Sequence, residues 1–186
     1  MFKNKLSIGS LAAVVAAFFI STATAQEQVS IGAVEMPVVD NSAAFKEVKK
    51  RLGRWEGTMR QSISDRDIPV SYELKLTSGG NTIVETLVED GIEMLTTYTD
   101  KGGELVVTHY CSLGTEPVFK VAEMSDGALT VQLDEKANSF HAGHDSYVTE
   151  MKWVFDADDP NVLVNTGKVL IEGELVENYS KLTRVN

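Results

Sequence analysis

The chain has 186 residues, with 17 Lys and Arg against 27 Asp and Glu, and a formal net charge of −10. A surface of this sign repels phosphate backbones and anionic lipid surfaces, so we expect no nucleic acid among the partners. The chain has one cysteine, Cys111, so a disulfide framework within the chain is excluded and stability must come from a hydrophobic core.

Residues 1–25 have the features of an export signal. Lys3 and Lys5 precede an apolar run over residues 11–20, and the small residues 23–25 provide a cleavage site. The run is shorter than the ~20 residues of a spanning helix, so no membrane insertion is expected. Cleavage after Ala25 removes both lysines and no acidic residue, which changes the net charge from −10 to −12. These features predict an exported protein, periplasmic or extracellular.

The segment that follows the signal, residues 26–41, has no clear periodicity and is expected to be a flexible lead-in. A short helix is predicted next, from about Ala43 to Leu52, with Asn41-Ser42 as its cap and Gly53 at its end. The helix has one apolar face, formed by Ala44, Phe45, Val48 and Leu52.

From Gly53 onward the hydrophobic pattern has a period of two, which is typical of half-buried strands. Turn signals at residues 78–81, 90–91 and 101–103 separate successive strands. About ten short strands and a single helix predict one all-β domain over residues 42–186. The period alone leaves open whether the strands form a barrel or a sandwich.

The Gly53-x-Trp55 pair, together with Arg184 in the last strand, resembles the pattern of the calycin superfamily. This resemblance implies a lipocalin-like antiparallel up-and-down β-barrel of about ten strands, with a short N-terminal helix. It further implies that the Arg184 guanidinium packs across the Trp55 ring and closes one end of the barrel, a cation–π contact.

A second resemblance rests on Thr108-His109-Tyr110-Cys111, followed by Gly114 and Pro117. These residues are similar to a family of exported lipocalin-like proteins of unknown function. The chain departs from that family at Thr115-Glu116 and Val118-Phe119, where relatives carry Asn-Gln and Arg-Met around the proline. The resemblance implies a fold and a location, but no activity.

The alternation of apolar and polar residues along each strand predicts which side chains face the interior. In the long strand near the end, Tyr147, Thr149, Met151, Trp153 and Phe155 share the inward face. Glu85 lies among apolar neighbours, and a buried carboxylate needs a partner, for which Arg184 or a tyrosine hydroxyl is suitable. The interior is expected to bind a small, mostly apolar molecule, and no catalytic residue is proposed. The candidate ligand-binding residues are Trp55, Tyr72, Glu85, Met94, Tyr98, His109, Cys111, Met151, Trp153 and Arg184.

Two alternatives remain open. His109, His141 and His144 are candidate ligands for zinc or haem, which would give redox or hydrolytic activity, although no further metal motif accompanies them. The second alternative is an envelope protein-interaction module whose barrel is filled by its own side chains. The main hypothesis requires no cofactor and expects a monomer or a weak homodimer.

Overall fold

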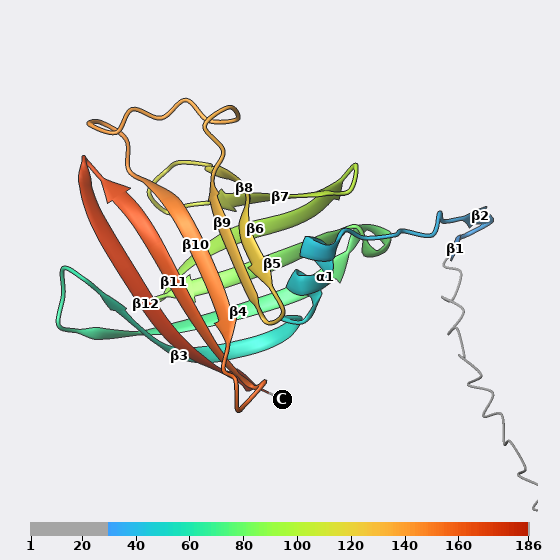
Figure 1. Cartoon of the computed structure of the whole chain (residues 1–186), viewed down its shortest axis with the longest axis horizontal. Coiled ribbons are helices and arrows are strands. Elements are labelled where there is room, and N and C mark those ends of the chain that lie inside the picture. Colours follow the sequence, from blue (N-terminus) through green and yellow to red (C-terminus); the bar gives the residue numbers. More distant parts are fainter. Residues whose placement is uncertain (1–29, 186) are drawn as a thin grey trace, which may run out of the picture.

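A computed structural model of the chain describes residues 30–185. Ten antiparallel strands form one closed barrel in which each strand pairs with its neighbours along the chain, and β12 returns to pair with β3 (Figure 1). The predicted all-β up-and-down barrel with one short helix is therefore confirmed. The predicted signal over residues 1–25 lies outside the described residues.

The barrel strands are joined mostly by short turns at the positions where the sequence carries its turn signals. Their bounds are β3 (Gly53–Gln61), β4 (Asp67–Thr77), β5 (Thr82–Glu89), β6 (Ile92–Lys101), β7 (Glu104–Tyr110), β8 (Val118–Ser125), β9 (Ala128–Leu133), β10 (Tyr147–Phe155), β11 (Val162–Ile171) and β12 (Glu174–Val185). A one-turn 3-10 helix, η1 (Ser78–Gly80), joins β4 to β5.

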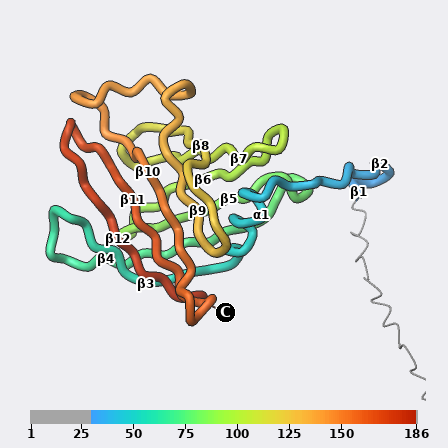
Figure 2. The backbone as a smooth tube through the Cα atoms, in the orientation of Figure 1, coloured from blue at the N-terminus to red at the C-terminus, as the bar shows by residue number. Residues whose placement is uncertain are grey.

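The segment before the barrel contains a small hairpin of β1 (Ser30–Ile31) and β2 (Val34–Glu35), which stands away from the barrel (Figure 2). From Asn41 onward the chain is tied to the barrel rim. The Asn41 side chain donates to the Gly80 carbonyl at 3.1 Å, and the Ser42 backbone N–H donates to Asp100 at 2.5 Å.

The helix α1 (Ala43–Lys49) covers this end of the barrel. The Ser42 hydroxyl accepts a hydrogen bond from the backbone N–H of Phe45, which confirms the predicted cap. The helix ends at Lys49, earlier than the predicted Leu52, because the next residues continue as a tighter turn. Phe45 and Val48 are fully buried beneath it.

Trp55 and Arg184 close the barrel next to the helix. The Arg184 guanidinium lies 4.1 Å from the centroid of the Trp55 ring, as the calycin resemblance implied. Its two terminal nitrogens donate to the carbonyls of Leu52 and Lys50, at 2.5 and 3.0 Å. The Trp55 indole N–H donates to the Arg51 carbonyl at 2.8 Å, so the indole and both terminal nitrogens of Arg184 are hydrogen-bonded.

Gly57 allows β3 to approach β12 unusually closely at the seam that completes the barrel. Gly57 pairs with Leu182, and a Cβ atom built on Gly57 would overlap the backbone carbonyl oxygen of Lys181. The absence of a side chain at this position is therefore a requirement of the closure.

In the strands whose inward face was predicted, the alternation follows the prediction except in β10. A β-bulge lies between Val148 and Glu150, so Val148 faces inward opposite Val169. Tyr147 instead stacks on Phe140 of the preceding loop, with ring centroids 4.6 Å apart. The predicted inward positions of Tyr147 and Thr149 are therefore wrong, because the bulge adds one residue that a strict period of two does not anticipate.

Candidate functional site

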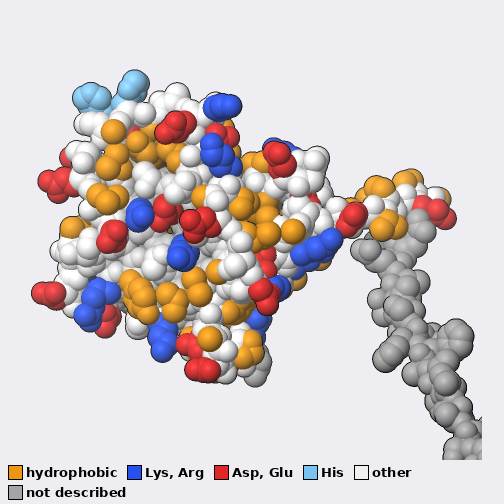
Figure 3. All heavy atoms as spheres, in the orientation of Figure 1, with side chains coloured by type: hydrophobic (Ala, Val, Ile, Leu, Met, Phe, Trp, Pro, Cys, Tyr) orange, Lys and Arg blue, Asp and Glu red, His pale blue; other side chains and the backbone are white. Residues whose placement is uncertain are grey.

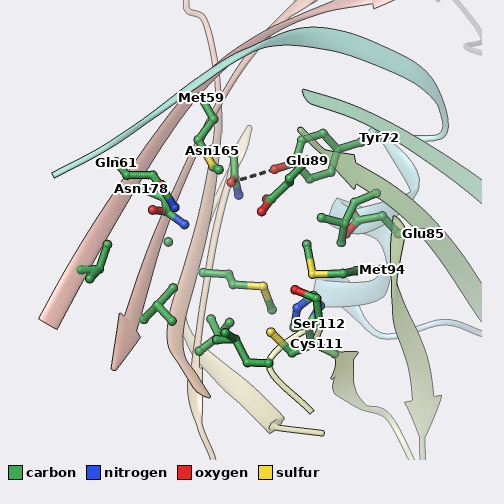
Figure 4. A pocket seen from close by; sticks show the side chains of 18 of the residues that line it. Met59, Gln61, Tyr72, Glu85, Glu89, Met94, Cys111, Ser112, Asn165 and Asn178 are labelled. Carbon is green, nitrogen blue, oxygen red and sulfur yellow. Dashed lines mark hydrogen bonds between the residues drawn. The ribbon is translucent and has the colours of Figure 1, made fainter. Parts of the chain in front are cut away.

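A cavity of about 170 Å³ lies inside the barrel, in the half that is opposite to α1. Figure 4 shows side chains that line it. Its lining comes from the later residues of β3, β5, β7 and β11, from the middle of β4 and from the earlier residues of β6, β10 and β12, with part of the β7–β8 loop. The apolar lining residues are Met59, Leu87, Met94, Leu113, Val148, Met151, Trp153, Val169, Ile171 and Val176. The polar ones are Gln61, Tyr72, Glu85, Glu89, His109, Cys111, Ser112, Asn165 and Asn178.

The volume of the cavity limits the size of what it can hold. An apolar cavity of roughly 150 Å³ is known to accept benzene, whereas pockets for drug-sized ligands occupy ~300–1,000 Å³. The cavity of about 170 Å³ thus matches one ring with a small substituent, and in this shape it does not accommodate a porphyrin.

Most of the predicted binding residues line this cavity. They are Tyr72, Glu85, Met94, His109, Cys111, Met151 and Trp153. The structure places the other three outside the lining. Trp55 and Arg184 form the closed end, and Tyr98 is fully buried behind Glu85. These three residues would therefore affect a molecule in the cavity only through the side chains that line it.

Glu85 forms part of the cavity wall and is 2% exposed. The Tyr98 hydroxyl donates to its carboxylate at 3.0 Å, so the predicted tyrosine partner is confirmed. Burial raises the pKa of Glu85, and the positive charge of Arg51 together with the Tyr98 hydrogen bond opposes this rise. The nearby cation is thus Arg51, where the sequence had suggested Arg184.

Arg51 is itself 2% exposed. Its guanidinium lies 4.1 Å from the Trp153 ring centroid and 5.2 Å from that of Tyr98. Its two terminal nitrogens find no hydrogen-bond partner among residues 30–185, so the aromatic faces and the Glu85 charge are what stabilise the cation there. Sequence reasoning missed Arg51, although it lies three residues after Val48 and therefore on the apolar face of the helical segment.

Glu89 is the second carboxyl group of the cavity, and it points into the cavity in Figure 4. Burial raises its pKa from 4.5 to about 7, the charge of Glu85 adds to the rise, and the Tyr72 hydroxyl opposes it. No Lys or Arg is among the described residues that line the cavity, so Glu89 has no cation beside it there. The signal for Glu89 was present in the sequence, because it continues the inward series of Glu85 and Leu87 at a period of two.

The remaining polar groups of the cavity are neutral at pH 7. His109 is 4% exposed, its Nδ1 lies 3.0 Å from the Thr96 hydroxyl, and burial lowers its pKa to about 4. Burial raises the pKa of the Cys111 thiol and of the Tyr72 hydroxyl, so both groups keep their protons. The Tyr72 hydroxyl donates to Asn165 at 3.4 Å. A protonated thiol beside a neutral imidazole is not an activated nucleophile.

The other two histidines lie away from the cavity. His141 and His144 are exposed in the β9–β10 loop, on the surface drawn in Figure 3, whereas His109 is inside the barrel. Over residues 30–185, no group of three His, Cys, Asp or Glu side chains is arranged to hold a metal ion. The structure does not bring the three histidines together as the zinc alternative requires.

We expect Glu89→Gln to stabilise the protein by about 1–2 kcal/mol at pH 8 and to have little effect at pH 5. The pKa of folded Glu89, about 7, lies above its ordinary value of 4.5, so the folded state binds the extra proton. The stability that this group contributes is therefore lost as the pH rises from about 4.5 to 7. Urea unfolding at both pH values measures the effect. The exposed Glu93→Gln is the control, and an equal change in both variants would contradict the expectation.

Comparison with known proteins supports the fold alone. No family model matches the chain, and no curated protein matches it. A solved structure of a protein with unknown function from the DUF3598 family of Nostoc punctiforme PCC 73102 is similar, with a TM-score of 0.55 and 14% sequence identity. The match covers 74% of this chain and 48% of that one, so this chain spans about half the length of the neighbour. Within residues 30–185, no helix is both long and apolar enough to cross a membrane.

Proposed function

We propose that the protein is an exported binding protein that holds one small, mostly apolar molecule in the half of its barrel opposite to α1, which contains the cavity. The observation that carries this proposal is the cavity of about 170 Å³, whose lining contains ten apolar side chains, most of them buried, beside nine polar ones. The leader-like residues 1–25 support the proposed export to a periplasmic or extracellular space. No cofactor and no catalytic step are part of the proposal.

The lining is suited to such a ligand. Met59, Met94 and Met151 line the cavity, and methionine side chains adapt readily to the shape of a ligand. Apolar surface that leaves water contributes roughly 25 cal/mol per Å², from which the entropy of association is subtracted. A ligand of one-ring size therefore gains modest affinity from burial, and the polar groups determine its orientation.

The filled-barrel alternative fits only the closed half of the barrel. There Trp55, Tyr98, Phe119 and Leu182 are fully or almost fully buried and fill the interior. The other half keeps a cavity of about 170 Å³, although Tyr72 and Trp153 are among the side chains that line it. This difference between the two halves favours a binding protein over a module with a filled interior.

The test fills the cavity and measures binding of benzyl alcohol by isothermal titration calorimetry. Val169→Phe places a larger side chain in the lining and is expected to weaken binding at least about tenfold. Val164→Phe makes the same change on the outward face of the same strand and is expected to leave binding unchanged. Equal binding by both variants, or no binding by the unmodified protein, would overturn the proposal.

A further inference from the structure

Building on the proposed function, we infer that the preferred ligand is a small organic cation, namely a protonated amine on a one-ring apolar body, with its ammonium group on Glu89. The inference concerns the same cavity and specifies the chemical class of the ligand. It rests on two comparisons within the lining: the number of carboxylates against the number of cations, and the number of hydrogen-bond acceptors against the number of donors.

The charge balance leaves one carboxylate without a cation. Glu85 has Arg51 and the Tyr98 hydroxyl on its side away from the cavity. In the described part of the chain, Glu89 has no Lys or Arg in the lining, and its charged neighbour in the cavity is the like-charged Glu85. An ammonium ion beside Glu89 would supply the missing charge in a partly desolvated site, where such a pair forms a strong hydrogen bond.

The hydrogen-bond acceptors of the cavity are also in excess. The side-chain oxygen of Asn178 is buried, and none of the residues that the structure describes donates a hydrogen bond to it. The single proton of the Tyr72 hydroxyl is shared between Asn165, at 3.4 Å, and the Glu89 carboxylate, and the Asn165 amide donates to the Lys152 carbonyl at 3.2 Å. Tyr72 thus offers at most one donor to the two oxygens of the Glu89 carboxylate, which can still accept a hydrogen bond from an ammonium group with its three donors.

The apolar part of such a ligand has a place beyond the carboxylate. Glu89 is the last residue of β5, and Leu87 lies one inward position deeper in the barrel. Met94 pairs with Leu87 from the adjacent strand, and both side chains line the cavity. An amine held at Glu89 can thus place its ring among these side chains. A carboxylate ligand would instead lie close to two carboxyl groups of like charge.

The class of ligand is tested with three probes that each carry one benzene ring and differ in the charge of their polar group. Benzylamine, benzyl alcohol and benzoate are titrated into the protein at pH 8 by calorimetry. We expect benzylamine to bind at least about tenfold more tightly than benzyl alcohol, and benzoate to bind most weakly. If the alcohol binds as well as the amine, or benzoate binds best, the inference is overturned and the proposed function stands. If no probe binds, both are overturned.

The variant Glu89→Gln tests whether Glu89 is the residue that binds the ammonium group. The variant should lose the preference for benzylamine and keep its affinity for benzyl alcohol, whereas the exposed Glu93→Gln should match the unmodified protein. A preference that survives in Glu89→Gln would overturn the assignment.

The pH dependence gives a second readout. The groups that face Glu89 are Glu85, Tyr72, His109 and Cys111, and the last three stay neutral between pH 6 and 8. Because the pKa of Glu89 is about 7, its ionised fraction and the affinity for benzylamine should rise about tenfold from pH 6 to 8. The rise should be absent in Glu89→Gln. A rise that persists unchanged there would place the ammonium on Glu85 and contradict the inference.

Discussion

Replacing Gly57 by alanine is expected to destabilise the barrel by about 3 kcal/mol or more, at the upper end of what overpacking usually costs. The added methyl group would overlap the backbone carbonyl oxygen of Lys181. A backbone atom cannot rotate away as a side chain can, so β12 would have to move away from β3 along the seam that closes the barrel. Urea unfolding followed by far-ultraviolet circular dichroism measures the loss.

Gly167→Ala is the matched control. Gly167 lies in β11, also inside the sheet, and a Cβ built there has its nearest contacts at 3.9 Å, to Asn178 and to the carbonyl of Glu150. Ordinary contact of this kind should change stability by less than about 1 kcal/mol. If Gly57→Ala unfolds at the same urea concentration as Gly167→Ala, close approach at the seam is not the constraint that we describe.

The second large effect is expected for Arg51→Met, which should cost about 3 kcal/mol at pH 8. Methionine keeps much of the side-chain volume but removes the cation that faces the buried Glu85 carboxylate. It also removes the stacking on Trp153 and Tyr98. Without the cation, the pKa of folded Glu85 rises further above its unfolded value. Stability of the variant is then lost as the pH rises above about 4.5, so the loss should be smaller at pH 5.

A double-mutant cycle with Glu85→Gln separates the charge from the packing. In the Glu85→Gln background, Arg51→Met should cost less at pH 8, and its cost should no longer depend on pH. Arg54→Met is the control, because Arg54 is exposed and pairs with Glu56 on the outer surface. An Arg51→Met cost that is the same with and without Glu85 would show that stacking alone holds the guanidinium.

The barrel was predictable because its strands face water on one side and the core on the other. Trp55 and Met59 alternate with charged residues in β3, and turn residues such as Asp90-Gly91 mark the ends of strands. The bulge at Val148–Glu150 was not predictable, since an inserted residue leaves no mark in a pattern of hydrophobicity.

The site was predictable only where the inward face carried unusual residues. Glu85 and His109 stand out among apolar neighbours, and both line the cavity. Arg184 was predicted both to stack on Trp55 and to contact the ligand; the stacking is present, and it holds Arg184 at the closed end. Arg51 was missed because it lies just beyond a short helix, and its burial depends on Trp153 and Tyr98, which are distant in sequence.

The chain enters and leaves the barrel at its closed end, and this placement decides where a tag or a fused domain would lie relative to the cavity. The chain enters the barrel at Asn41, on the α1 side, and leaves it at Val185, whose strand partner is Arg54 near the start of β3. Both points lie at the end opposite to the cavity. A tag, a surface or a fused domain joined at either point would therefore leave the cavity facing away from the attachment. The cavity would stay accessible to ligands when the protein is immobilised on a surface.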